Sequence, residues 1–100
     1  MSARVTKWEG PPPSEDELTA RFDDEGLSAR RWGNGPGDRY GRHLHGYHKV
    51  LYCLSGSIVF HTDDGDHELR PGDRLDVEPA TDHAATVGPE GVECMEATRP

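Results

Sequence analysis

The sequence lacks any long run of apolar residues, and it contains few cysteines. Nothing in it approaches the ~20 consecutive apolar residues of a membrane-spanning helix, and Met1–Gly10 has no apolar core of the kind found in signal peptides. The two cysteines, Cys53 and Cys94, both lie in apolar segments. Buried free thiols are the default in a reducing compartment, and the sequence gives little support for a disulfide. We therefore expect a cytoplasmic protein with no membrane partner.

Positive charge is also scarce, since 11 Lys and Arg residues stand against 19 Asp and Glu residues and give a formal net charge of -8. A protein of this charge repels phosphate backbones, so we expect no nucleic-acid partner. Apolar residues make up only 32% of the 100-residue chain, which is enough for one domain with a small core. Such a domain is helped by a closed architecture, by dimerisation or by a bound metal.

Almost the whole chain lacks the apolar periodicity of a helix, and residues 1–13 lack it entirely. Gly10-Pro11-Pro12-Pro13 favours an extended polyproline conformation. Residues 1–13 are therefore interpreted as an extended N-terminal arm, and residues 14–100 as a single domain. The sequence shows no internal repeat and no interdomain linker.

One short helix is predicted directly after the arm. Ser14 and Glu17 have the spacing of a capping box, in which each side chain bonds the backbone N–H of the other residue. Acidic residues follow in the first turn, where the helix dipole favours negative charge. Leu18 and Phe22 are four residues apart and give the segment one apolar side. We expect a helix over about residues 15–25, docked on the rest of the domain by these two side chains.

From residue 27 onward the signals are those of short strands and turns. Gly, Pro and Asp clusters separate segments that are rich in β-forming residues, and a turn is predicted at Ser55-Gly56. The pattern predicts an all-β antiparallel sandwich or barrel. The expected strands cover residues 27–32, 49–54, 57–62, 67–69, 75–78, 84–87 and 92–97.

The six histidines all fall between residues 43 and 83. His43 and His45 are two positions apart, which on an extended strand places both imidazoles on one face. Two imidazoles on one face can chelate a transition metal. His61 and His67 flank an acidic turn, so we expect both to be exposed.

Two stretches of the chain resemble the two sequence motifs of the cupin family. Residues 41–56 read GRHLHGYHKVLYCLSG and are similar to the first motif, with H-x-H followed by a Tyr-containing strand and a turn glycine. Residues 71–83 read PGDRLDVEPATDH and are similar to the second motif, with a Pro-Gly-Asp turn, a strand, a proline turn and a histidine. The resemblance implies an antiparallel jelly-roll β-barrel, here with a short N-terminal helix.

The same resemblance implies a site and a range of activities. His43, His45 and His83 would converge inside the barrel as ligands of a divalent transition metal, for which iron, manganese, zinc, nickel and copper are all suitable. We expect a late histidine to meet an earlier pair only if the sheet closes. The classes of reaction that the resemblance brings in are those of dioxygenases, isomerases and lyases, and the sequence assigns no catalytic residue.

Lys49 departs from the family pattern, because it aligns with the acidic metal ligand of the first motif. An ammonium beside a divalent cation is repulsive, so we expect Lys49 to be neutral, to swing away, or to pair with a carboxylate such as Asp76 or Glu78. His48 is a possible additional ligand, although on a regular strand it points away from Lys49.

The neighbours of Lys49 define the rest of the predicted pocket. Tyr47 precedes it, and Leu51 and Cys53 share its side of an alternating strand. We expect the pocket to be lined by Lys49, Tyr47, Leu51 and Cys53. Glu93 and Glu96, near the C-terminus, are interpreted as outward-facing strand positions.

Three functions fit these observations. The first is a metal-dependent enzyme acting on a small polar molecule in the barrel. The second is a non-catalytic module that binds a small molecule without a metal and uses Lys49 to hold an anionic ligand. The third is a structural or partner-binding barrel whose residues 1–13 lie across a second subunit. A homodimer is compatible with all three, because an exposed sheet edge and an apolar face need cover.

Overall fold

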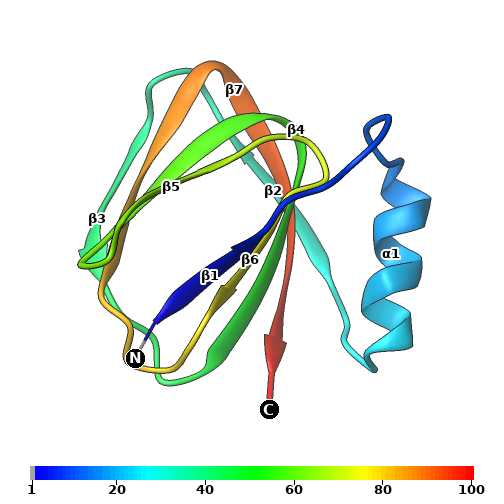
Figure 1. The fold of residues 1–100 in the computed structure, drawn as a ribbon, viewed down its shortest axis with the longest axis horizontal. Coiled ribbons are helices and arrows are strands. Elements are labelled where there is room, and N and C mark those ends of the chain that lie inside the picture. The colour runs from blue at the N-terminus through cyan, green and yellow to red at the C-terminus, as the bar shows by residue number, and fades with distance from the viewer. Residues whose placement is uncertain (1) are drawn as a thin grey trace.

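The computed structural model describes residues 2–100, which form one helix and a seven-stranded antiparallel sheet (Figure 1). The strand order is β1-β6-β4-β7-β2, with β3 also paired to β7 and β5 to β4. The prediction of an antiparallel all-β fold with a short N-terminal helix is therefore confirmed. The order ends at β1 and β2, so within residues 2–100 the ladder does not close into a continuous barrel. The elements are β1 (Ala3–Thr6), α1 (Glu15–Asp24), β2 (Arg30–Asn34), β3 (Arg39–His43), β4 (His48–Thr62), β5 (Gly65–Leu69), β6 (Arg74–Val77) and β7 (His83–Arg99).

Two long strands, β4 and β7, form the centre of the fold. They pair antiparallel along their whole lengths, from His48 opposite Arg99 to Thr62 opposite His83. The predicted turn at Ser55-Gly56 is therefore wrong, as is the predicted break over residues 88–91. The chain does not reverse at either place. Residues that have no partner on the opposite strand form register shifts there, and these shifts bend the strands. Figure 1 shows both strands curving around a common interior.

The register shifts in β4 also decide which residues face inward. Leu51 and Cys53 belong to the interior core before the shifts, whereas Ile58 and Phe60 belong to it afterwards. A strand without a bulge alternates strictly, so odd and even positions could not both face one side. The bulge therefore lets a single strand keep its apolar residues inside on both sides of the bend. The full interior cluster is Leu51, Cys53, Ile58, Phe60, Leu69, Leu75, Val77, Ala85, Val87, Val92 and Cys94.

The helix covers the outer side of the two long strands. Ser14 caps it as predicted, accepting a hydrogen bond from the Glu17 backbone N–H while the Glu17 side chain accepts one from the Ser14 N–H. Leu18 and Phe22 are almost fully buried. They pack on the outward-facing apolar side chains of β4 and β7 and so form a second core, made up of Leu18, Phe22, Leu27, Val50, Tyr52, Met95 and Ala97.

The segment before the helix adds the strand β1 to the sheet. Residues Ala3–Thr6 pair antiparallel with β6, with Ala3 opposite Val77 and Thr6 opposite Arg74. Trp8 then packs on Gly72, where an added Cβ would lie 2.4 Å from the indole Cγ. Within residues 2–100 there is no helix both long and apolar enough to cross a membrane.

Candidate functional site

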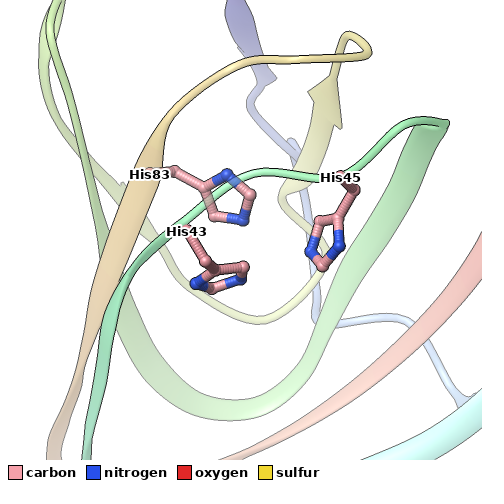
Figure 2. A group of neighbouring side chains, drawn as sticks. All are labelled: His43, His45 and His83. Atoms are coloured by element: carbon pink, nitrogen blue, oxygen red, sulfur yellow. The ribbon is translucent and has the colours of Figure 1, made fainter.

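Three imidazoles from two separate parts of the chain meet on one side of the sheet (Figure 2). His43 ends β3, His45 lies in the loop that follows, and His83 begins β7. The ring centroids are 4.8 Å apart for His43 and His45, 4.4 Å for His43 and His83, and 5.3 Å for His45 and His83. One ligand atom from each ring lies within 4.8 Å of the other two, and these three side chains are called the histidine cluster below.

Strand pairing places the cluster. His83 lies opposite His43 of β3 and opposite Thr62 of β4, so its position is fixed from both sides. The strand ends at His43, so His45 is positioned by its loop and not by regular strand geometry. Its carbonyl accepts a hydrogen bond from the Ala80 N–H at 2.7 Å, which joins this loop to the turn before His83. The two histidines predicted as a pair therefore do meet, although the regular strand assumed for them stops at the first.

Backbone carbonyls set the tautomers of two members of the cluster. His83 Nδ1 lies 2.9 Å from the Thr81 carbonyl oxygen, and His43 Nδ1 lies 2.7 Å from the Gly41 carbonyl oxygen. A carbonyl can only accept, so each Nδ1 carries the proton and each Nε2 presents a lone pair. This hydrogen bond is the usual one for metal-binding histidines, because it orients the ring and leaves the other nitrogen free to coordinate.

His83 Nε2 is a buried polar atom without a partner among residues 2–100. Its side chain is almost fully buried, and that burial lowers the pKa of His83. Burial, followed by the nearby charge of Lys49, lowers the pKa of His45 as well. Both shifts favour the neutral imidazole, which is the form that binds a metal ion.

The cluster opens on a cavity of about 450 Å³. Tyr47 stacks on the His45 ring, with centroids 4.8 Å apart, and Trp32 meets Tyr40 edge-on at 5.9 Å. The volume is within the range of small-molecule sites, and four aromatic side chains are among the fourteen lining residues. The lining residues are Arg30, Arg31, Trp32, Gly33, Asn34, Tyr40, His43, His45, Tyr47, Lys49, Phe60, His83, Ala85 and Glu96.

Lys49 is paired with a carboxylate in this cavity, but not with either of the predicted ones. Its Nζ lies 3.3 Å from Glu96 Oε1, and the two side chains are only 10% and 12% exposed. Trp32 Nε1 donates a hydrogen bond of 2.7 Å to the same oxygen. Asp76 instead binds His48 and Arg74, so the prediction of Asp76 or Glu78 as the partner is wrong.

Glu96 is a cavity residue whose orientation the sequence interpretation predicts wrongly. It was expected to face outward, but it shares the parity of Val92 and Cys94, which are both buried in the interior cluster. That alternation was visible in the sequence and would have placed Glu96 inside. Trp32, on β2, and Phe60, on β4, also line the cavity and are not predicted as pocket residues from the sequence.

Other residues predicted for the site lie elsewhere. His48 Nε2 is 3.0 Å from Asp76 Oδ1, on the opposite side of β4 from Lys49. Leu51 and Cys53 face inward but are fully buried in the core. Neither is among the described residues that line the cavity. Cys53 lies opposite Cys94, and both thiols are free.

Comparison with known proteins adds a family and several relatives. The profile of the Cupin domain family matches residues 32–96. Quercetin 2,3-dioxygenase of Bacillus subtilis (strain 168) is 44% identical over an alignment of 52 residues that covers 50% of this chain and 15% of that protein. The chain therefore spans only a small part of the length of this curated relative.

Solved structures share the fold. An RmlC-like cupin from Shewanella frigidimarina NCIMB 400 superposes with a TM-score of 0.65 at 27% identity, over 74% of this chain and 66% of the other. A DUF861 family protein from Thermotoga maritima has a TM-score of 0.64 at 14% identity, over 98% of this chain and 100% of the other. The second similarity concerns the fold alone.

Proposed function

The chain belongs to the cupin family, and on this premise we propose that it is a metal-dependent enzyme acting on a small molecule held in the cavity beside the histidine cluster. His43, His45 and His83 would hold a divalent transition metal. Among the reaction classes brought in by the family, the similarity to quercetin 2,3-dioxygenase favours a dioxygenase.

The observation that carries the proposal is the unpartnered Nε2 of His83. A buried polar atom without a hydrogen bond is costly, and such atoms are rare in folded proteins. Here the atom belongs to a ring whose other nitrogen is committed to the Thr81 carbonyl, and it faces two more imidazoles. A coordinated metal satisfies this lone pair, and the donor set of three neutral imidazoles suits the borderline transition metals.

Lys49 is compatible with this assignment because its charge is opposed within the cavity. The Glu96 carboxylate at 3.3 Å offsets the repulsion between the ammonium and a divalent cation. Replacing an acidic ligand by a lysine therefore leaves three histidine ligands and open coordination positions, as catalytic metal sites require.

A bound metal would act there as a Lewis acid or as a centre for dioxygen chemistry. The chain itself provides the surroundings. The Thr81 and Gly41 carbonyls hold the His83 and His43 rings in their binding tautomers. Aromatic side chains, among them Trp32 and Tyr47, offer flat surfaces to a substrate.

Metal analysis of untagged protein tests the proposal. The protein is incubated separately with Fe(II), Mn(II), Zn(II), Ni(II) and Cu(II), desalted, and analysed by inductively coupled plasma mass spectrometry. We expect about one metal per chain in the wild type for at least one of these ions, and its loss in His83→Ala. His67→Ala is the matched control, because His67 bonds Thr62 outside the cluster and its removal leaves the three ligands intact.

A wild type that retains none of the five metals would overturn the proposal, as would a His83→Ala protein that retains as much metal as the wild type. The reaction class is tested on the loaded protein by dioxygen uptake, with quercetin as the probe. Uptake by the wild type that is absent from His83→Ala supports a dioxygenase, whereas a loaded wild type that consumes no dioxygen removes quercetin dioxygenation from the proposal.

A further inference from the structure

We propose that Lys49 recognises the carboxylate of a small aromatic acid, and that Glu96 holds the Lys49 ammonium until this ligand replaces it. This inference adds a substrate class to the proposed function. It rests on the proposed function because it takes the cavity as the substrate site, and it concerns residues of the cavity wall and not the metal ligands.

Lys49 and the histidine cluster border the same space. Both line the cavity, and the Phe60 ring is near both, with its centroid 6.0 Å from Lys49 Nζ and 6.4 Å from the His83 ring centroid. A ligand whose anionic group meets Lys49 can therefore extend its body along Phe60 toward the cluster. The cavity of about 450 Å³ has room for a molecule of one or two rings.

The ion pair with Glu96 does not use all the hydrogen-bond donors of Lys49. The 3.3 Å separation is longer than the roughly 2.7–2.9 Å of a well-formed charge-assisted hydrogen bond. The same Glu96 oxygen already accepts from Trp32 Nε1 at 2.7 Å. An ammonium offers three donors, so a ligand carboxylate can bind Lys49 while Glu96 keeps its hydrogen bond to Trp32.

The charges around the cavity favour an anion. Among residues 2–100, its lining contains Arg30, Arg31 and Lys49 but only one carboxylate, Glu96. Arg31 is neutralised by Glu15 and Glu93, whereas Glu96 is shared between Lys49 and, at 3.6 Å, Arg30. One carboxylate therefore opposes two cations, in a protein whose net charge is -8. Lys49 and Arg30 therefore carry one positive charge more than the carboxylate they share, and a bound divalent metal would add positive charge beside Lys49.

The walls favour an aromatic body on that anion. Trp32, Tyr40, Tyr47 and Phe60 all line the cavity. Flat aromatic ligands gain both area burial and offset or edge-on ring contacts from such walls. Aliphatic acids of the same charge would gain only the contact with Lys49.

The experiment compares benzoate with benzamide, which has nearly the same shape and no charge. Affinities are measured by calorimetry and by NMR titration of metal-free protein, so that a carboxylate–metal contact cannot contribute. We expect the wild type to bind benzoate about tenfold more tightly than benzamide. Lys49→Met should abolish this preference, and Glu96→Gln should tighten benzoate binding severalfold, because a competing carboxylate is removed. Arg70→Met, which removes an exposed cation that pairs with Glu68 and is not among the residues that line the cavity, should leave the preference unchanged.

A double variant guards against misfolding. Lys49→Met leaves the largely buried Glu96 carboxylate with only its longer contact to the exposed Arg30. Lys49→Met/Glu96→Gln leaves no buried charge there, and a thermal melt shows whether it folds. The folded double variant should show no preference for benzoate. The inference is overturned if the wild type binds both probes equally, if the double variant keeps the preference, or if Glu96→Gln weakens benzoate binding.

Metal analysis of the same preparations separates this inference from the proposed function. A wild type without metal that still binds benzoate through Lys49 supports the inference and overturns the metalloenzyme proposal. A wild type that holds metal on its histidines but does not discriminate benzoate from benzamide leaves the metal site standing and overturns the inference.

Discussion

His83 and Asp73 are both buried polar residues, but their surroundings differ. One nitrogen of His83 is satisfied by the Thr81 carbonyl, and the other has no partner in the described part of the chain. Asp73 accepts hydrogen bonds at both oxygens, from the Trp8 N–H, the Arg70 N–H and Lys7 Nζ. The unsatisfied atom marks a candidate binding site, whereas the saturated carboxylate fastens the N-terminal segment to the turn before β6.

Asp73→Asn should destabilise the protein by about 2 kcal/mol at pH 7, because an amide cannot accept three hydrogen bonds as the carboxylate does. Burial alone would raise the pKa of Asp73, but the hydrogen bonds from Trp8, Arg70 and Lys7 prevail and lower that pKa. The folded state therefore binds the proton less readily than the unfolded state. The stabilisation is present above the unfolded pKa of about 3.9 and is lost as the pH falls through the folded pKa.

Urea unfolding at a series of pH values measures this effect. The difference in unfolding free energy between wild type and Asp73→Asn should be largest at neutral pH and shrink as the pH falls below about 4. Asp64→Asn, in an exposed turn, should change stability by less than about 0.5 kcal/mol. A difference that grows toward low pH would contradict the assigned role of Asp73.

At the scale of elements, the bend in β4 depends on one glycine. Gly56 has a φ of +73°, and a Cβ added there would lie 2.0 Å from the Gly91 carbonyl oxygen. The clash is with backbone of the paired strand β7, which cannot move aside as the end of a flexible side chain can. The two long strands therefore approach one another at a place that only glycine can occupy.

Gly56→Ala should cost much more stability than Gly26→Ala. Gly26 has a similar φ of +71° at the end of the helix, but nothing lies within 4 Å of its added Cβ. Gly26→Ala should therefore lose about 1 kcal/mol from the left-handed backbone alone. We expect Gly56→Ala to lose at least about 3 kcal/mol or to fail to fold, since strand separation is added to the same backbone cost. Equal losses in a thermal or urea melt would show that the contact with Gly91 does not constrain the bend.

At the scale of the whole molecule, the histidine cluster joins β3 and its following loop to the start of β7. These segments lie about forty residues apart in the sequence and meet only in the folded state. A metal that binds all three rings therefore binds the folded chain and not the unfolded one, so its binding free energy adds to stability.

Saturating metal should raise the melting temperature of the wild type. At a free metal concentration one hundred times Kd, the gain is about 2.7 kcal/mol, which for a domain of this size corresponds to roughly 10 °C or more. His83→Ala should show no comparable rise, and EDTA should reverse the effect in the wild type. Calorimetry across a metal titration measures the shift, and an equal rise in both proteins would place the stabilising metal at another site.

Local features of the sequence determined the helix, the class of the fold and two of the three members of the cluster. The capping box at Ser14 and Glu17, and the spacing of Leu18 and Phe22, act within a few residues and need no tertiary context. The Gly- and Pro-separated strands indicate an antiparallel sheet for the same reason. The third histidine, His83, came from the resemblance to the family, because nothing local connects it to His43.

Only the tertiary structure decided how the long strands bend and which charge meets Lys49. A glycine between two apolar segments is typical of a turn, and the contact with β7 that makes it a bulge involves Gly91, which is remote in sequence. The parity of β7 was enough to place Glu96 inside, but its pairing with Lys49 depends on the register of two strands. The register of two strands depends on burial and hydrogen bonding over the whole sheet, so it cannot be predicted from the sequence of a single segment.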